Sequence, residues 1–382
     1  MIWRAFRAAP PQSSSNPLLA LLTSVFGGRA ADGELVTVDT AMRVAAVHAC
    51  VSLISRTIAS LPLHVYERTR AGGRILLRTP STEFLWRRPN PEMTRTEFWE
   101  GAIAHAVLQG NSFIYVAPAA NISGRRPAEL WPLDSARVTI GGRDSQGRMT
   151  YVIDGTTPQL SWSQGGNILH IRGLTLDGIS GVSPIAVAAT SIRTAYLSAQ
   201  SAARIMGSGG IPSGVLTIAD RITQEEADRI AAEFEARHGD RRSVLVLNRE
   251  ANWKPVAISP DDMQAIDTRR FEVVDIARVF GVPPEMIGAG VEGASSLTYA
   301  NVQDRMIQFA QLSLQPWIAR FEQAISDELL PSPQYVKFDM RGLLRGNSEQ
   351  RVHYYNALAG LGALTVNEIR ELEDMPALEG SQ

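Results

Sequence analysis

The sequence predicts a mixed α+β protein with more than one domain. Three observations lead to this class: the chain length, two kinds of hydrophobic periodicity, and a change near residue 183 from short strands to a long helix. A chain of 382 residues exceeds one ordinary core, and 45% hydrophobic residues are enough to fill two or three. Some segments repeat apolar residues every three or four positions and others alternate, as amphipathic helices and half-buried strands do.

Residues 1–38 are predicted to form an N-terminal arm. They are rich in Pro, Ser and Gly, and their apolar run at 17–26 is too short for a membrane span. No signal peptide and no membrane contact are expected. The single cysteine, Cys50, has no cysteine in the chain to pair with, which indicates a reducing compartment such as the cytoplasm.

Residues 39–182 are predicted to form one α+β region. A helix is expected over 40–61, followed by a strand at 62–68, and a second helix over 96–109. Short strands bounded by Gly, Pro or Asp turns follow. Their sequences are GNSFIYVAP, ELWPL, ARVTIGG, MTYVIDG and NILHIRG.

Residues 183–207 are predicted to form one long helix. Ser183 can cap it, Pro184 suits its first position and Gly207 can end it. Its many alanines require neighbours to approach closely. A crowded ring of parallel helices and an ordinary bundle both fit this composition.

A compact insert and another helix come next. Residues 208–258 read as strand, helix, strand and strand. A helix over 259–280 then starts at a Ser-Pro pair and must end before Pro283 and Pro284, which form the turn into the following loop.

That loop, 281–296, contains G-x-G-x-x-G at Gly288, Gly290 and Gly293. A dinucleotide site needs a buried strand before its first glycine, and the sequence here predicts a helix end instead. The pattern therefore favours a pliant connector over nucleotide binding, because glycine lowers the cost of unusual backbone angles.

A helix over 297–334, kinked at Pro316, and a terminal segment over 335–382 complete the chain. The terminal segment is expected to hold a strand at YVKFDM and two short helices. The sequence has no phosphate-binding P-loop motif, and its six histidines are dispersed. We expect no metal, no cofactor and no enzymatic activity.

Acidic side chains gather on one face of the helix at 259–280. Asp261, Glu272 and Asp275 fall within about 60° of one another at 100° per residue. A solvated helix face explains this stripe. A surface that repels phosphates is the functional alternative to this usual explanation, and the net charge of −2 argues against static binding of nucleic acid.

The order of these parts resembles the HK97-like portal proteins of tailed bacteriophages, prophages and gene transfer agents. The resemblance covers roughly residues 39–375. The stretches that carry it are AVHACVSLISRTIASLPLHVYER, LQGNSFIYV, ILHIRG with GISGVSPI, DIARVFGVPPEMIG and LTVNEIRELEDMP.

The resemblance implies a ring, normally of twelve subunits, at one capsid vertex, through which double-stranded DNA passes without sequence-specific contacts. Residues 39–182 would be the wing, 183–207 and 259–280 the stem helices, 208–258 the clip, 281–296 the tunnel loop, 297–334 the kinked wing helix, and 335–382 a short crown. Asp261, Glu272, Asp275 and Glu292 would line the channel.

The implied partners are further copies of the chain, the large terminase subunit, a head-completion or adaptor protein and the major capsid protein. The particle would assemble in the host bacterial cytoplasm. Two alternatives remain at this stage: an enzyme that binds a nucleotide at Gly288–Gly293, and a capsid adaptor or scaffold that forms no ring.

Overall fold

The computed structural model describes residues 28–29, 35–70, 72–119, 125–207, 214–218, 251–255, 271–289, 305–341 and 348–373, besides a few single positions. These residues belong to two units. The first comprises Met1–Thr194 with Glu272–Gln382, and the second comprises Ala195–Phe271. No helix in these ranges has both the length and the apolar character needed to cross a bilayer.

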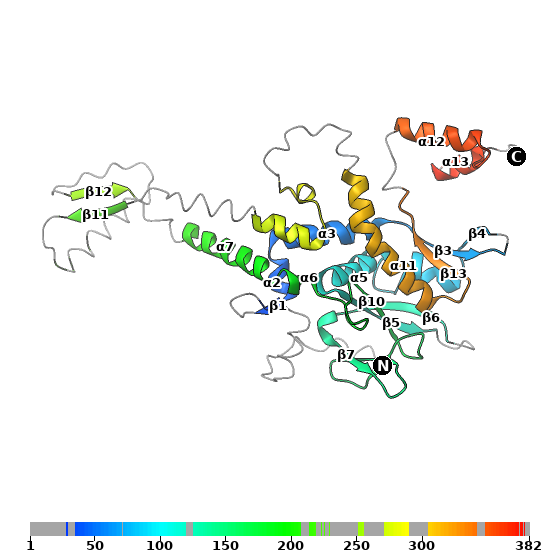
Figure 1. Cartoon of the computed structure of the whole chain (residues 1–382), viewed down its shortest axis with the longest axis horizontal. Coiled ribbons are helices and arrows are strands. Elements are labelled where there is room, and N and C mark those ends of the chain that lie inside the picture. The colour runs from blue at the N-terminus through cyan, green and yellow to red at the C-terminus, as the bar shows by residue number, and fades with distance from the viewer. Residues whose placement is uncertain are drawn as a thin grey trace. The chain divides into compact units, whose positions relative to one another are not determined.

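The first unit begins with alternating short helices and strands (Figure 1). They are β1 (Gly28–Arg29), β2 (Leu35–Val36), α2 (Val38–Met42), α3 (Ala45–Ser60), β3 (Leu63–Arg68), β4 (Arg74–Leu77), η2 (Pro80–Thr82), α4 (Glu83–Trp86), α5 (Arg95–Gln109), β5 (Asn111–Pro118), β6 (Pro127–Leu133), η3 (Ser135–Arg137), β7 (Val138–Arg143), β8 (Met149–Ile153), β9 (Gln159–Leu160), β10 (Ile168–Arg172) and α6 (Pro184–Val187).

Helix α7 (Ala189–Gly207) runs from the first unit into the second, where β11 (Gly214–Ile218) pairs antiparallel with β12 (Ala251–Pro255). The predicted clip helix lies almost entirely outside the described residues. The remaining elements belong to the first unit, apart from Phe271: a helix over 271–280, η4 (Pro284–Ile287), a helical turn at 305–309, η5 (Ala310–Leu314), α11 (Gln315–Leu329), β13 (Gln334–Phe338), α12 (Ser348–Gly360) and α13 (Val366–Leu372).

The predicted helix over 40–61 is two helices. Val44 has an extended backbone, with φ −83° and ψ 117°, which separates α2 from α3. The apolar stripe itself is confirmed, because every predicted position is buried. These positions are Val44, Val47, Val51, Ile54, Ile58 and Leu61.

Three antiparallel three-stranded sheets organise the first unit, in the orders β10-β5-β6, β13-β3-β4 and β7-β8-β9. The pairing of β13 with β3 places Val336 opposite Val65. Strand β13, which the sequence analysis places at the start of the terminal segment, therefore pairs with a strand of the 39–182 region. The strand is part of a sheet built mainly from the N-terminal half, because Val336 and Phe338 are buried beside β3.

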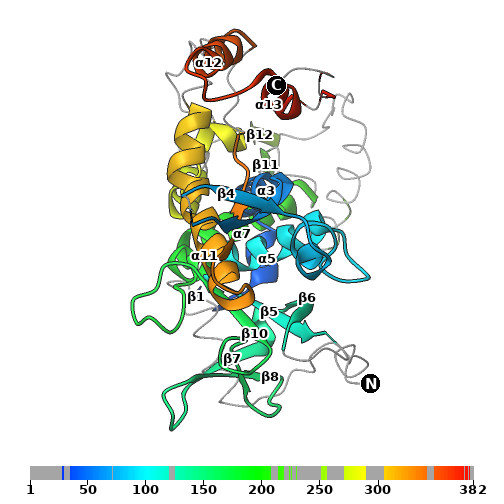
Figure 2. The ribbon, with the colours of Figure 1, turned by 90° about the vertical axis from the view of Figure 1, so that its right-hand side faces the viewer.

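Aromatic rings from distant parts of the sequence meet in the core. Trp99 of α5 packs edge-on against Phe321 of α11 at 6.3 Å and against Phe338 of β13 at 6.4 Å between ring centroids. Both views of the ribbon show α11 beside the strands it contacts, β13 and β10 (Figure 1, Figure 2). Helix α11 thus ties the C-terminal half to the N-terminal sheets.

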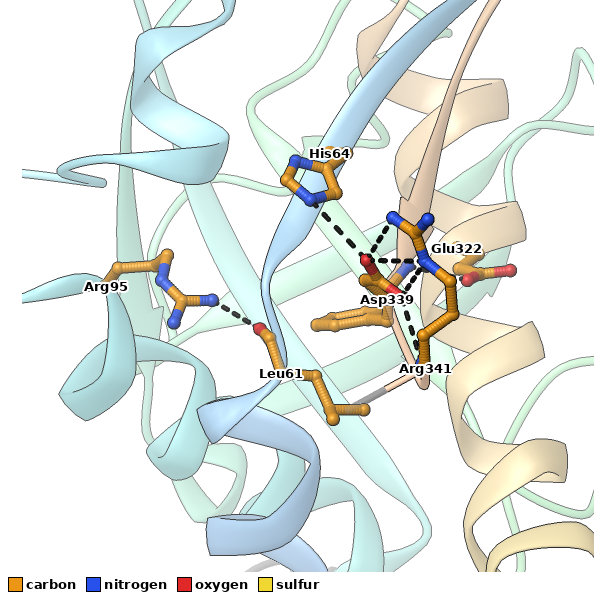
Figure 3. A network of polar contacts seen from close by, with 7 residues as sticks. Leu61, His64, Arg95, Glu322, Asp339 and Arg341 are labelled. Atoms are coloured by element: carbon orange, nitrogen blue, oxygen red, sulfur yellow. Dashed lines mark hydrogen bonds and ion pairs between the residues drawn. The ribbon is translucent and has the colours of Figure 1, made fainter. Parts of the chain in front are cut away.

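A polar network fixes the same region (Figure 3). The buried Glu322 accepts from the Phe338 backbone N–H at 2.8 Å and from Lys337 Nζ. Asp339 accepts from Arg341 Nε at 2.9 Å, and this hydrogen bond lowers the pKa of the Asp339 carboxyl. Arg95 Nη1 donates to the Leu61 carbonyl at 2.6 Å. These contacts hold the ends of β3 and β13 against α11 and α5.

Two predicted helices are less regular than expected. Ser183 caps α6 by accepting from the Ala186 N–H, with Pro184 in its first turn, but Ala188 separates α6 from α7. Before Pro316, the helix widens into the π-helical turn η5. Proline has no N–H for the carbonyl four residues earlier, so a local change of helix type is the expected response.

Candidate functional site

The structure describes five of the predicted site residues in the region of the glycine loop: Glu272, Asp275, Pro283, Pro284 and Gly288. The others in this region lie outside the described residues. These are Asp261, Gly290, Glu292 and Gly293.

The helix over 271–280 ends at Phe280, where the sequence predicts it to end. Gly281 follows with φ +67°, and the Val282 N–H donates to the Ala277 carbonyl at 2.9 Å. Phe280 and Val282 are both buried. The end of this helix is therefore anchored in the first unit.

Pro283 and Pro284 lead into η4, which Gly288 ends in a left-handed conformation with φ +78°. A Cβ at Gly288 would meet no atom within 4 Å, so the glycine serves the backbone angle and not close packing. A helix and η4 occupy 271–287, and no strand precedes Gly288 there. The buried strand that a dinucleotide site requires before its first glycine is therefore missing here.

Two side-chain contacts join the chain on either side of residues 290–304. Glu285 of η4 forms an ion pair with Arg305 at 3.5 Å, and the Ser313 hydroxyl donates to the Gly281 carbonyl. Both η4 and η5 also contact α3. The two ends of the loop segment thus share one fixed base, which the sequence analysis missed because no local spacing links these residues.

The predicted acidic stripe is only partly exposed. Glu272 is 8% exposed, whereas the Asp275 side chain is 31% exposed and pairs with Arg278. Glu272 lies four and eight residues before the buried Ile276 and Phe280, so it shares the packed face of the helix. On this subunit the Asp275 side chain is therefore partly exposed, and Glu272 is buried.

A second junction, around Asn111, positions the start of α6. The Asn111 side chain accepts from the Gly181 N–H at 2.8 Å and donates to the Gly181 carbonyl at 3.0 Å. His170 Nε2 donates to Asn111 Oδ1 at 2.9 Å, and Tyr151 donates to His170 Nδ1 at 3.3 Å. Burial lowers the pKa of His170 to about 3, so the ring is neutral. This cluster holds the loop before Ser183 against β5.

The other strongly shifted groups are also packed in the interior. Burial raises the pKa of Cys50 to about 12 and that of Tyr151 to about 12. In the described part of the chain, His, Cys, Asp and Glu form no group of three that could hold a metal ion. The distinctive features of this part are the two junctions, at the base of the glycine loop and around Asn111.

A family model described as "Phage portal protein" matches residues 45–374. The chain belongs to the phage portal protein family. A probable portal protein of Streptomyces phage phiC31 is 32% identical over 92% of this chain and 79% of its own length. The portal protein of Enterobacteria phage HK97 is 29% identical over 89% of this chain and 80% of its own.

Solved portal-related structures share the fold. A chain from the virion of a native gene transfer agent particle has a TM-score of 0.63 at 24% identity, covering 99% of this chain and 98% of that one. The crystal structure of an HK97-family phage portal protein from Corynebacterium diphtheriae has a TM-score of 0.55 at 17% identity, covering 81% and 96%. The predicted α+β class and the HK97-like portal resemblance are confirmed, and neither alternative reading is favoured.

Proposed function

We propose that this portal protein forms a ring at one capsid vertex, through which double-stranded DNA enters during packaging and leaves during ejection. The observation that carries the proposal is the fixed base of residues 290–304, made by Glu285–Arg305 and Ser313–Gly281, in a chain of the portal family. These contacts keep the two ends of the connecting segment together, so that the segment between them can change shape.

A ring of twelve copies is part of the proposal. The neck of a native gene transfer agent particle, computed with C12 symmetry, contains a chain of similar fold, with a TM-score of 0.60 at 23% identity. A closed cyclic assembly needs one heterologous contact repeated around the axis. The same capsid location implies contacts with the major capsid protein.

Within the ring, 39–182 and 297–334 form the wing and 183–207 and 259–280 the stem. Residues 208–258 form the clip, which docks the large terminase subunit and later a head-completion protein. The tunnel loop is 281–296, and 335–382 form a short crown. The particle assembles in the host cytoplasm.

Weak repulsion of DNA follows from the acidic residues of the stem and loop. A few cation–phosphate contacts per subunit, repeated around a ring, would bind DNA tightly and stall it. The acids proposed to line the channel are Asp261, Glu272, Asp275 and Glu292, and Asp275 is the more exposed of the two that the structure describes. Gly288, Gly290 and Gly293 give the loop compliance.

Charge reversal at Asp275 tests this function. Asp275→Lys should leave rings intact and slow DNA packaging in a reconstituted reaction with terminase. Asp327→Lys is the matched control, because Asp327 is exposed on α11, outside the proposed stem and loop. Equal packaging rates for both variants and the unmodified protein would remove the acidic-channel assignment.

A further inference from the structure

Strand β4 is an open edge of the β13-β3-β4 sheet. It pairs with β3 on one side, and no described strand pairs with its other side. Ile75 is 57% exposed and Leu76 is 39% exposed. Edge strands carry unpaired backbone N–H and C=O groups that can template another strand, and exposed apolar residues add to this tendency.

A pocket of about 200 Å³ lies beside this edge. Its wall combines apolar side chains, among them Leu63, Leu77 and Trp86, with Arg78, Arg95 and His64. The pocket therefore offers an apolar surface and two guanidinium groups to the same ligand.

Within the described ranges, the two arginines of this pocket, Arg78 and Arg95, form no ion pair with a carboxylate. Arg95 is half-buried and donates to the Leu61 carbonyl, while Arg78 is exposed. Asp339 lies 4.0 Å from His64 Nε2, but Arg341 engages its carboxylate at 2.6 Å (Figure 3). The nearby acid is thus already occupied.

Further positive charge lies along the same strand pair. Arg68 and Arg74 face each other across β3 and β4, an arrangement of like charges that disfavours the pairing. Each guanidinium lies over a tyrosine ring, Arg68 over Tyr335 at 5.3 Å and Arg74 over Tyr66 at 4.5 Å. An acidic ligand at the edge would relieve this repulsion.

We propose that β4 and the adjacent pocket form a docking site for an extended acidic peptide of a partner protein. The peptide adds to the sheet as a strand beside β4. Its apolar side chains lie on the face of Ile75 and Leu77, and its acidic side chains lie on the face of Arg74 and Leu76, where a carboxylate is placed against Arg78 at the pocket. Alternation along the added strand sends every second side chain to the same face, so an apolar–acidic alternation fits best. The apolar wall favours a peptide over a phosphate chain, which would leave it uncovered. This site does not depend on the proposed channel.

Binding to the full-length chain tests the site with a labelled peptide of alternating valine and glutamate. We expect saturable binding by fluorescence anisotropy, and slower amide hydrogen exchange confined to β4 and the pocket. Arg78→Glu should weaken binding by about tenfold or more, because a charge-assisted contact becomes repulsive. The matched control Arg70→Glu lies on the exposed turn after β3, outside the pocket, and should bind nearly as the unmodified chain does.

Two control ligands separate the contribution of the acidic side chains from that of backbone pairing with β4. An alternating valine–lysine peptide should not compete, and the acidic peptide with N-methylated amides should bind poorly, because it cannot pair with the edge. The proposal is overturned if the acidic peptide fails to bind at its solubility limit, if both arginine variants bind alike, or if exchange in β4 is unchanged. Binding of duplex DNA alone, lost in Arg78→Glu, would instead identify a phosphate surface.

Discussion

Two junctions of this portal protein contain glycine for different structural reasons. At the Asn111 junction, a Cβ on Gly181 would overlap the Gly110 carbonyl oxygen, and a Cβ on Gly110 would overlap the Val182 carbonyl. At the loop base, a Cβ on Gly288 or Gly281 would meet no atom within 4 Å, yet both residues have positive φ. At the first junction glycine permits close packing, and Gly110 there also has a φ of +72°; at the second junction glycine serves only the backbone turn.

This difference gives the two junctions different mechanical properties. The Asn111 junction joins β5, β10 and the start of α6 through buried hydrogen bonds, so it transmits position rigidly. The loop base is held by an ion pair whose side chains are 35% and 33% exposed and by one hydroxyl contact. Removal of individual contacts should therefore cost much more at the first junction.

The largest effect is expected for Gly181→Ala. The new methyl group must displace backbone, and we expect a loss of about 4 kcal/mol or more in the free energy of unfolding. Denaturant titration measures it. Gly178→Ala in the same loop is the control: its φ is +70° but its surroundings are open, so about 1 kcal/mol is expected. Equal losses would refute the packing role of Gly181.

The next effect is a pH dependence centred on His170. Its folded pKa of about 3 lies below the ordinary value of 6.5, so between these values the unfolded chain takes up a proton that the folded chain does not. Stability is full above pH 6.5 and falls as the pH is lowered, by about 2 kcal/mol at pH 5. His170→Gln should flatten this fall in chemical denaturation, leaving a remainder from His64 and His105, whose pKa values burial also lowers. An unchanged slope would contradict the prediction.

A smaller effect is expected for Gly288→Ala. Only backbone strain opposes this change, so the loss should be about 1 kcal/mol in thermal or denaturant unfolding. Gly288→Asn should cost less, since asparagine adopts left-handed angles more readily than alanine. A loss as large as that of Gly181→Ala would show that the loop base is as crowded as the Asn111 junction.

The smallest effect concerns Glu285 and Arg305. Because both side chains are about one-third exposed, solvent screening should limit their coupling free energy to at most about 1 kcal/mol. A double-mutant cycle with both alanine variants measures it, and added salt should reduce it. A larger coupling free energy that does not depend on salt would contradict this prediction and would mean that the ion pair is rigid and shielded from solvent.

Local signals predicted much of the fold. The apolar stripe of α3, the Ser183 cap and the helix end before Pro283 each depend on residues close in sequence, and each is confirmed. Strand β4 was missed because its short RILL segment shows no alternation and is largely exposed. Alternation in a sequence indicates a strand with one buried face, and most of β4 is exposed.

The candidate site was harder to predict, since its contacts are long-range. Asn111 and Gly181 lie 70 residues apart, and no spacing rule links Glu285 to Arg305. The inward packing of Glu272 did have a signal in the sequence, its four-residue spacing to Ile276 and Phe280. The charge pattern pointed the other way, and packing of the apolar face decided the outcome.

The position of the glycine loop in the assembled ring tests the central claim most directly. Cys50 is the single cysteine, and it is buried with a pKa raised to about 12, so Ala289→Cys introduces one reactive thiol at the loop base. A thiol-reactive gold cluster can then be located by electron microscopy of the purified protein. The account predicts closed rings with gold density around a central hole. Gold on the outer rim, or a stable single subunit even with capsid partners present, would contradict it.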